Sequence, residues 1–208
     1  MNNTFKPTIA MAFPKIVAVC GVMRSGKDTV SNHLCDKYGY ENVKIADTLK
    51  KTVSMLFNFN HDQIEGSLKD TIDPYWGITP RKAMQFFGTE VMKYEIQKIL
   101  PDVGRTFWMS SLVSKLDSMP TDKLFVVSDM RFIHEYEYLV NHYKKENVFV
   151  IKLNRPSIQS STSTHQSEKE IELIKEDILI CNDGTITCLY KKIDDCMKNL
   201  IKLNYSMS

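Results

Sequence analysis

The chain has 208 residues, with 27 basic and 25 acidic side chains and a formal net charge of +2. This near balance argues against polymeric nucleic acid or a membrane surface as the main partner, since both attract strongly basic chains. Five cysteines without a CxxC pair argue against a disulfide framework, and no apolar run approaches the roughly 18 residues of a membrane span, so we expect one soluble domain in the reducing cytoplasm.

The strongest local signal is the stretch IVAVCGVMRSGKDT at residues 16–29. Its apolar start predicts a buried strand, and the four-residue apolar spacing that follows predicts a helix that opens at Lys27. Gly21 and Gly26 frame a loop whose amide N–H groups can point inward, and Lys27 can reach the outer phosphates of a nucleotide. The alternative interpretation is a tight strand-to-helix turn with a surface lysine.

The residue after this lysine departs from the general phosphate-loop pattern. A Ser or Thr normally stands there and holds Mg²⁺, whereas this chain has Asp28 at that position and Thr29 after it. The sequence leaves three ways of holding the ion open: through Asp28, through Thr29, or through water.

The rest of the chain alternates between strand and helix patterns. We expect helices at 49–57, from Pro80 with Thr79 as its N-cap until Pro101, around 108–116, at 133–143 and in a closing segment to about 203. We expect strands at 43–46, 124–127, 148–153 and 178–181, with an irregular excursion at 58–77. This order predicts an α/β fold with a central parallel sheet.

Charged side chains follow two of the predicted strands. Asp47 follows the strand at 43–46, and Asp129 and Arg131 follow the strand at 124–127. Because ligands of open α/β sheets bind beyond the carboxyl ends of the strands, we expect all three beside the phosphate loop. Asp129 has the position of a residue that orients Mg²⁺ or its waters, and Asp47 is a candidate to bind an acceptor sugar or to support Arg131. Both carboxylates could instead be helix caps.

Phosphoryl transfer needs positive charge around the reacting oxygens, and guanidinium groups match phosphate oxygens in pairs. The arginines in the loop, excursions and predicted sheet edge are therefore candidates, although each could be a solvated surface charge: Arg24, Arg81, Arg131 and Arg155. Gln85 and Trp76 are candidate base contacts. Residues 155–168 are rich in Ser and Thr and predict a lid-like loop, in which His165 and Glu168 are either a proton relay or, as we favour, solvated residues.

Taken in order, these motifs resemble the deoxynucleoside monophosphate kinase family of large DNA phages and viruses, and more distantly phosphomevalonate kinase. The similar stretches are GVMRSGKDT at 21–29, IADTLK at 45–50, TPRKAMQFFGTE at 79–90, SDMRF at 128–132, HQSE at 165–168 and ICNDGT at 180–185. The Asp-Thr ending of the phosphate loop is what this family shows, so the departure noted above fits the resemblance.

The resemblance implies a P-loop nucleoside monophosphate kinase-like three-layer fold that transfers a phosphoryl group from ATP, with Mg²⁺, to a deoxynucleoside monophosphate in DNA precursor synthesis. The residues expected to bind the ATP phosphates are Gly21, Arg24, Ser25, Gly26, Lys27, Asp28 and Thr29. Those expected to hold the metal are Asp28, Thr29 and Asp129, and those expected to act in catalysis are Lys27, Asp129, Arg131 and Arg155. Those expected to bind the acceptor are Asp47, Lys50, Trp76, Arg81, Gln85 and Arg131.

The implied organisation is a single P-loop kinase domain over 1–208, with an acceptor-binding insertion at about 58–118 and a lid-like loop at about 155–168. Two other functions stay open. One is a small-molecule kinase similar to phosphomevalonate kinase, and the other is a P-loop protein that binds a nucleotide without phosphorylating an acceptor, for which Asp28 is the only support. The sequence does not decide which base is accepted or whether the chain forms a homodimer.

Overall fold

A computed structural model describes residues 13–158 and 166–206, and the protein divides into two compact units. Unit 1 comprises Met1–Lys44 and Met119–Ser208, and unit 2 comprises Ile45–Ser118. Unit 2 is therefore inserted between two segments of unit 1. Among the described helices, none is both long enough and apolar enough to cross a membrane.

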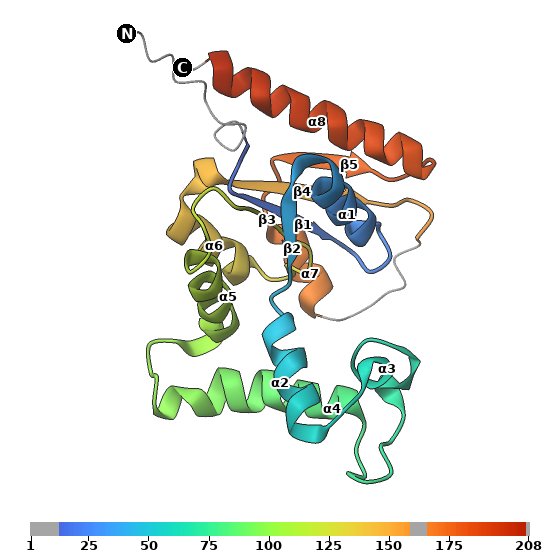
Figure 1. Ribbon diagram of the computed structural model, residues 1–208, viewed down its shortest axis with the longest axis vertical. Coiled ribbons are helices and arrows are strands. Elements are labelled where there is room, and N and C mark those ends of the chain that lie inside the picture. Colours follow the sequence, from blue (N-terminus) through green and yellow to red (C-terminus); the bar gives the residue numbers. More distant parts are fainter. Residues whose placement is uncertain (1–12, 159–165, 207–208) are drawn as a thin grey trace. The chain divides into compact units, whose positions relative to one another are not determined.

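Unit 1 is built on a five-stranded parallel sheet with the strand order β2-β3-β1-β4-β5 (Figure 1). Its strands are β1 (Ile16–Gly21), β2 (Tyr40–Val43), β3 (Leu124–Val127), β4 (Val148–Asn154) and β5 (Ile178–Cys181). Every residue of the central strand β1 is buried, as a parallel strand covered on both faces requires. This sheet confirms the predicted α/β fold.

Helices cover both faces of the sheet in unit 1. They are α1 (Lys27–Tyr38), α6 (Ile133–Tyr143), the 3₁₀ turn η6 (Lys145–Asn147), α7 (Gln166–Leu173) and α8 (Ile186–Ser206). On one face, Val30 and Leu34 of α1 pack in a common core with Leu189, Ile193 and Met197, which recur at four-residue spacing along α8.

The opposite face of the sheet is covered by α6, which packs against β4 and α7. Leu139 of α6 and Ile174, which follows α7, are completely buried. The layers are therefore α1 and α8, the sheet, and α6 with α7 (Figure 1).

Two expectations for unit 1 were wrong at their boundaries. The strand predicted at 43–46 lies at Tyr40–Val43, because β3 offers only four pairing positions and its register places Tyr40 opposite Leu124. The Tyr40 hydroxyl also donates to the carbonyl of Pro14 at 2.9 Å. The lid-like loop predicted at 155–168 ends earlier, since α7 begins at Gln166, and residues 159–165 lie outside the described residues.

Unit 2 is helical throughout its described elements. These are α2 (Asp47–Phe57), α3 (His61–Ile64), η2 (Ser67–Asp70), α4 (Pro80–Gln85), η3 (Phe86–Tyr94), η4 (Glu95–Lys98), η5 (Gly104–Thr106) and α5 (Phe107–Asp117). Val53, Phe59, Ile64, Ala83 and Met84 form its buried core. The segment 58–77, predicted as irregular, contains α3 and η2.

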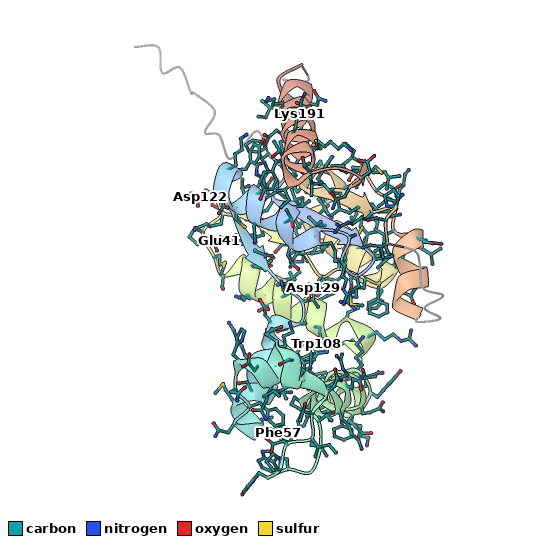
Figure 2. All side chains as sticks on the ribbon, turned by 90° about the vertical axis from the view of Figure 1, so that its right-hand side faces the viewer. Glu41, Phe57, Trp108, Asp122, Asp129 and Lys191 are labelled. Atoms are coloured by element: carbon teal, nitrogen blue, oxygen red, sulfur yellow. The ribbon has the colours of Figure 1, made fainter. Side chains whose placement is uncertain are left out.

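The helix predicted from Pro80 starts where expected and then changes form. Thr79 caps it, because its Oγ1 accepts the Lys82 amide at 3.1 Å. From Phe86 to Tyr94 the turns widen into a π-helix, η3. The Gly88 carbonyl within η3 accepts the indole N–H of Trp108, labelled in Figure 2, at 2.9 Å, which ties α5 to η3.

Candidate active site

The phosphate loop joins β1 to α1, and both of its glycines are required by the backbone. Gly21 has φ +147°, and a Cβ atom there would lie 2.6 Å from the Leu153 carbonyl oxygen. Gly26 has φ +107°, and a Cβ atom there would lie 2.6 Å from Nδ2 of Asn182. Any other residue at either position would be strained and would clash, so the spacing of the two glycines reflects the loop geometry.

The Lys27 side chain folds back over the start of this loop. Its Nζ donates to the carbonyl oxygens of Gly21 at 2.9 Å and Val22 at 2.8 Å. Burial lowers the pKa of Lys27, the positive charge of Arg131 lowers it further, and Asp28 and Asp129 oppose these effects. An anion that binds here would relieve the repulsion between the ammonium and guanidinium groups.

Ser25 and Asn182 hold the far end of the loop. Nδ2 of Asn182 donates to the Ser25 carbonyl at 2.9 Å, and its backbone amide donates to the Asn154 carbonyl at 2.7 Å. The Ser25 hydroxyl is buried without a hydrogen-bond partner among the described residues, and its amide donates to the Val22 carbonyl at 3.2 Å. A phosphate contact from the Ser25 amide would therefore require that amide to turn away from Val22, whereas the hydroxyl has no partner among the described residues to release.

The segment after β3 brings Asp129 and Arg131 to the same edge of the sheet as the loop. Asp129, labelled in Figure 2, is half-buried two residues beyond the strand. The buried Glu135 carboxylate accepts the amides of Arg131 at 2.7 Å and Phe132 at 3.0 Å. Glu135 thus fixes the backbone of this segment and leaves the Arg131 side chain exposed.

Further residues at this edge also meet the loop. Nη1 of Arg155, which follows β4, donates to the Arg24 carbonyl at 3.2 Å. Asp28 is exposed on the first turn of α1, where Lys44 donates to its Oδ1 at 3.2 Å, and Thr29 is half-buried beside it. The structure therefore brings Lys27, Asp28, Asp129, Arg131 and Arg155 to one region of unit 1.

The donor set of this region suits Mg²⁺. Among the residues that the structure describes, no three His, Cys, Asp or Glu side chains form a metal cage. Mg²⁺ does not need one, since proteins usually hold it through one or two carboxylates together with substrate phosphates and water. Asp28 and Asp129 both act electrostatically on Lys27, so two such carboxylates lie within reach of the loop.

The remaining candidates belong to unit 2. Asp47 is half-buried in the first turn of α2, and Lys50 of the same helix pairs with Glu65 at 2.8 Å. Arg81 pairs with Asp70, and Gln85 is exposed on α4. Asp47 therefore lies four residues beyond β2 on a helix rather than at the end of a strand.

Trp76 is held in an aromatic cluster of unit 2. Its indole N–H donates to the Phe57 carbonyl at 2.8 Å. Its ring contacts the Phe57 ring edge-on, with 5.1 Å between the ring centroids. Phe57, labelled in Figure 2, also stacks on Phe59 at 5.2 Å. A base could therefore stack only on the part of the Trp76 ring that this cluster leaves exposed.

Sequence reasoning missed two residues that shape the site. Asn182 lies in the ICNDGT stretch at 180–185 and was given no role of its own, although its side chain holds the phosphate loop. Glu135 was treated only as part of a helix. Of the two lid candidates, Glu168 lies in α7, and His165 lies outside the described residues.

A model of the deoxynucleotide monophosphate kinase family matches residues 59–193. The chain belongs to this family. A protein of Acanthamoeba polyphaga mimivirus that carries the same kinase description is 32% identical over 200 residues, which cover 91% of this chain and 99% of the relative. These matches confirm the resemblance inferred from the motifs.

Phage members of the deoxynucleotide monophosphate kinase family are more distant. The deoxynucleotide monophosphate kinase of Escherichia phage RB69 is 25% identical over 163 residues, which cover 77% of this chain and 54% of the phage protein. Among solved structures, a gluconokinase from Sinorhizobium meliloti superposes with a TM-score of 0.51 at 13% identity and covers 94% of this chain and 98% of its own. At that identity the likeness shows the kinase-like fold alone.

Proposed function

We propose that the chain transfers the γ-phosphoryl group of ATP to the 5′-phosphate of a deoxynucleoside monophosphate, and so supplies a diphosphate for DNA precursor synthesis. The observation that carries this proposal is the half-buried Lys27 on a glycine-framed loop, with its pKa lowered by burial and by the charge of Arg131. Family membership supports a deoxynucleoside monophosphate as the acceptor.

The transferred group carries negative charge on several oxygens, so catalysis depends on alignment and neutralisation. In the proposed complex, ATP phosphates replace the Gly21 and Val22 carbonyls as acceptors for the Lys27 ammonium, with help from the loop amides and Arg24. Arg131 and Arg155 contact the transferred or the acceptor phosphate. Asp28, Thr29 and Asp129 would hold Mg²⁺, which when bound neutralises charge on the phosphate oxygens.

The acceptor-binding role belongs in this proposal to the segment at about 58–118, together with Asp47 and Lys50 just before it. Arg81 would contact the acceptor phosphate, and Gln85 and Trp76 would contact its base. The segment at about 155–168, whose last three residues belong to α7, keeps the proposed role of a lid, and Arg155 at its start reaches the phosphate loop. The two units would work as one kinase domain.

The direct test is release of ADP from ATP and Mg²⁺ with a panel of deoxynucleoside and ribonucleoside 5′-monophosphates and with phosphomevalonate. We expect at least one deoxynucleoside monophosphate to stimulate ADP release, and the matching deoxynucleoside, which lacks the phosphate, to fail. Stimulation by phosphomevalonate alone would replace the proposal with a different small-molecule kinase. ATP binding without stimulation by any acceptor would indicate a non-catalytic nucleotide-binding protein.

A further inference from the structure

Two ion pairs lie on neighbouring elements of unit 2. Arg81 of α4 donates two hydrogen bonds to the Asp70 carboxylate, from Nε to Oδ1 at 2.5 Å and from Nη2 to Oδ2 at 2.9 Å. Lys50 of α2 pairs with Glu65, the C-cap of α3, at 2.8 Å. A guanidinium that holds a carboxylate through two parallel hydrogen bonds is in the geometry that also suits phosphate.

Lys69 adds a third cation to these two pairs. Within the described parts of the chain it forms no ion pair, and its side chain is half-buried. Burial lowers the pKa of Lys69, and the charges of Lys50 and Arg81 lower it further, against the opposing effects of Glu65 and Asp70. Lys69 thus lies within electrostatic reach of two other cations and two carboxylates, so the cluster holds one more cation than carboxylates.

Helix caps and helix packing hold the backbone that carries these side chains. Asn60 and Gln63 form a reciprocal capping box at the start of α3, and η2, which carries Lys69 and Asp70, packs against α3 and α4. Thr79 caps α4 just before Arg81. Arg81 therefore comes from a capped helix, and Lys69 from a turn that packs against two capped helices.

We propose that Lys50, Lys69 and Arg81 form the site for the acceptor's phosphate monoester, and that the Asp70 carboxylate occupies Arg81 until this phosphate displaces it. The identity of the ligand rests on the function proposed above. The role of Lys69 as a phosphate ligand and of Asp70 as a built-in competitor follows from the cluster itself.

Charge explains why a phosphate monoester would win this competition. It carries about −1.5 to −2 at pH 7 and three acceptor oxygens, against a single charge and two oxygens on a carboxylate. The Arg81–Asp70 pair is weakly held, because the two side chains are 48% and 66% exposed and water competes for both. A nucleoside without its phosphate has nothing to exchange for Asp70, so the cluster selects for the monophosphate.

Calorimetric titration of the full-length chain tests the cluster, with inorganic phosphate and the common deoxynucleoside 5′-monophosphates as probes. A Lys27→Met background removes the main cation of the phosphate loop, so that the remaining phosphate binding reports on unit 2. We expect Lys69→Met to weaken binding of both kinds of probe by about tenfold, the loss of one charge-assisted hydrogen bond. We expect Asp70→Asn to tighten it by about two- to fivefold, since it removes the competing charge.

The Lys98–Glu95 ion pair of η4 provides matched controls in the same unit. Lys98→Met and Glu95→Gln make the same charge changes outside the cluster and should leave phosphate affinity unchanged. Tighter binding in Asp70→Asn cannot arise from misfolding, so this variant keeps the test valid if Lys69→Met loses stability.

The outcomes separate this site from the proposed function. Unchanged phosphate and monophosphate binding in both variants, with monophosphate turnover intact in the protein that keeps Lys27, would overturn the site and leave the function standing. A failure of Asp70→Asn to tighten binding would overturn the competition by Asp70. Absence of monophosphate turnover, with inorganic phosphate still responding to both substitutions, would overturn the function and leave an anion site.

Discussion

In the proposed function, the Lys27 side chain prepares the phosphate loop for an anion. Its ammonium is half-buried and satisfied by the carbonyls of Gly21 and Val22. Burial and the charge of Arg131 both lower the pKa of Lys27, so the charged ammonium is less favourable here than in water. A bound phosphate would stabilise the ammonium by placing negative charge beside it. Charge placed in advance where a phosphate will sit needs little rearrangement during catalysis.

Replacing this lysine tests that role. We expect Lys27→Met to reduce acceptor-dependent ADP formation about 100- to 1000-fold, because one fixed donor to the transition state is lost. Initial rates at saturating substrate measure the effect. Lys191→Met is the matched control, since Lys191 is exposed on α8 and is labelled in Figure 2. Turnover near that of the unaltered protein in Lys27→Met would contradict the donor site.

The residues of the loop could be predicted because their signal is local. The glycine spacing, the preceding apolar strand and the lysine all lie within a few positions of each other. The contact of Asn182 with Ser25 could not be predicted in this way, since it joins residues 157 positions apart and depends on where β5 ends. The pairing of Arg81 with Asp70 similarly depends on how η2 packs on α4.

Helices α1 and α8 are joined by polar contacts as well as by their common apolar core. The Asp194 carboxylate of α8 accepts from Lys37 at 2.6 Å and Tyr38 at 2.7 Å, and lies 2.8 Å from Nε2 of His33. The His33 ring also stacks on Tyr190 at 4.0 Å. Burial alone would raise the pKa of Asp194, but these hydrogen bonds hold it well below its ordinary value.

This shift predicts a dependence of stability on pH. A carboxyl group whose folded-state pKa is depressed stabilises the protein above its unfolded-state pKa, near 4, and loses that contribution as the pH falls through the folded-state value. The Asp194 side chain is only 17% exposed. We therefore expect Asp194→Asn to lower the free energy of unfolding at pH 7 by roughly 2 kcal/mol, with the difference shrinking below about pH 4.

Urea unfolding followed by circular dichroism at several pH values would measure this difference. Asp195→Asn, at the exposed neighbouring position, is the control and should have little effect. An equal loss of stability at pH 7 and in acid would show that the carboxylate charge is not what joins α8 to α1.

The predicted boundaries of helices and strands agree with the structure where the apolar residues are regularly spaced. The helix predicted at 133–143 and the strands predicted at 124–127 and 178–181 are confirmed at those bounds. The strand predicted at 43–46 was wrong because its register is set by pairing with β3. The π-helix at Phe86–Tyr94 has no separate signal in the sequence, and the contacts of its Gly88 with Leu49 and Trp108 join residues 20 or more positions apart.

For the molecule as a whole, the fold class followed from the order of elements, and an inserted segment was expected at about 58–118, whereas the start of unit 2 at Ile45 was not expected. Unit 2 leaves unit 1 after β2 and returns before β3, and these two strands pair directly with each other. Unit 2 begins before the expected insertion because α2 packs against α4, η3 and α5, and this packing cannot be read from the sequence around residue 45.

Charge is likewise organised within each unit rather than over the whole chain. The net charge of +2 conceals two separate groups of cations, Lys27 with Arg131 in unit 1 and Lys50, Lys69 and Arg81 in unit 2. In the proposed reaction Lys27 holds the phosphates of the donor, Arg131 contacts the transferred or the acceptor phosphate, and the group in unit 2 holds the phosphate of the acceptor. Both groups must act for the transfer to occur.

Transfer of label from [γ-³²P]ATP tests this account most directly, because it separates phosphoryl transfer from hydrolysis. With Mg²⁺ and an accepted deoxynucleoside monophosphate, we predict that the label appears in the deoxynucleoside diphosphate and that inorganic phosphate stays near background. Label found only in inorganic phosphate, whichever monophosphate is added, would contradict the account.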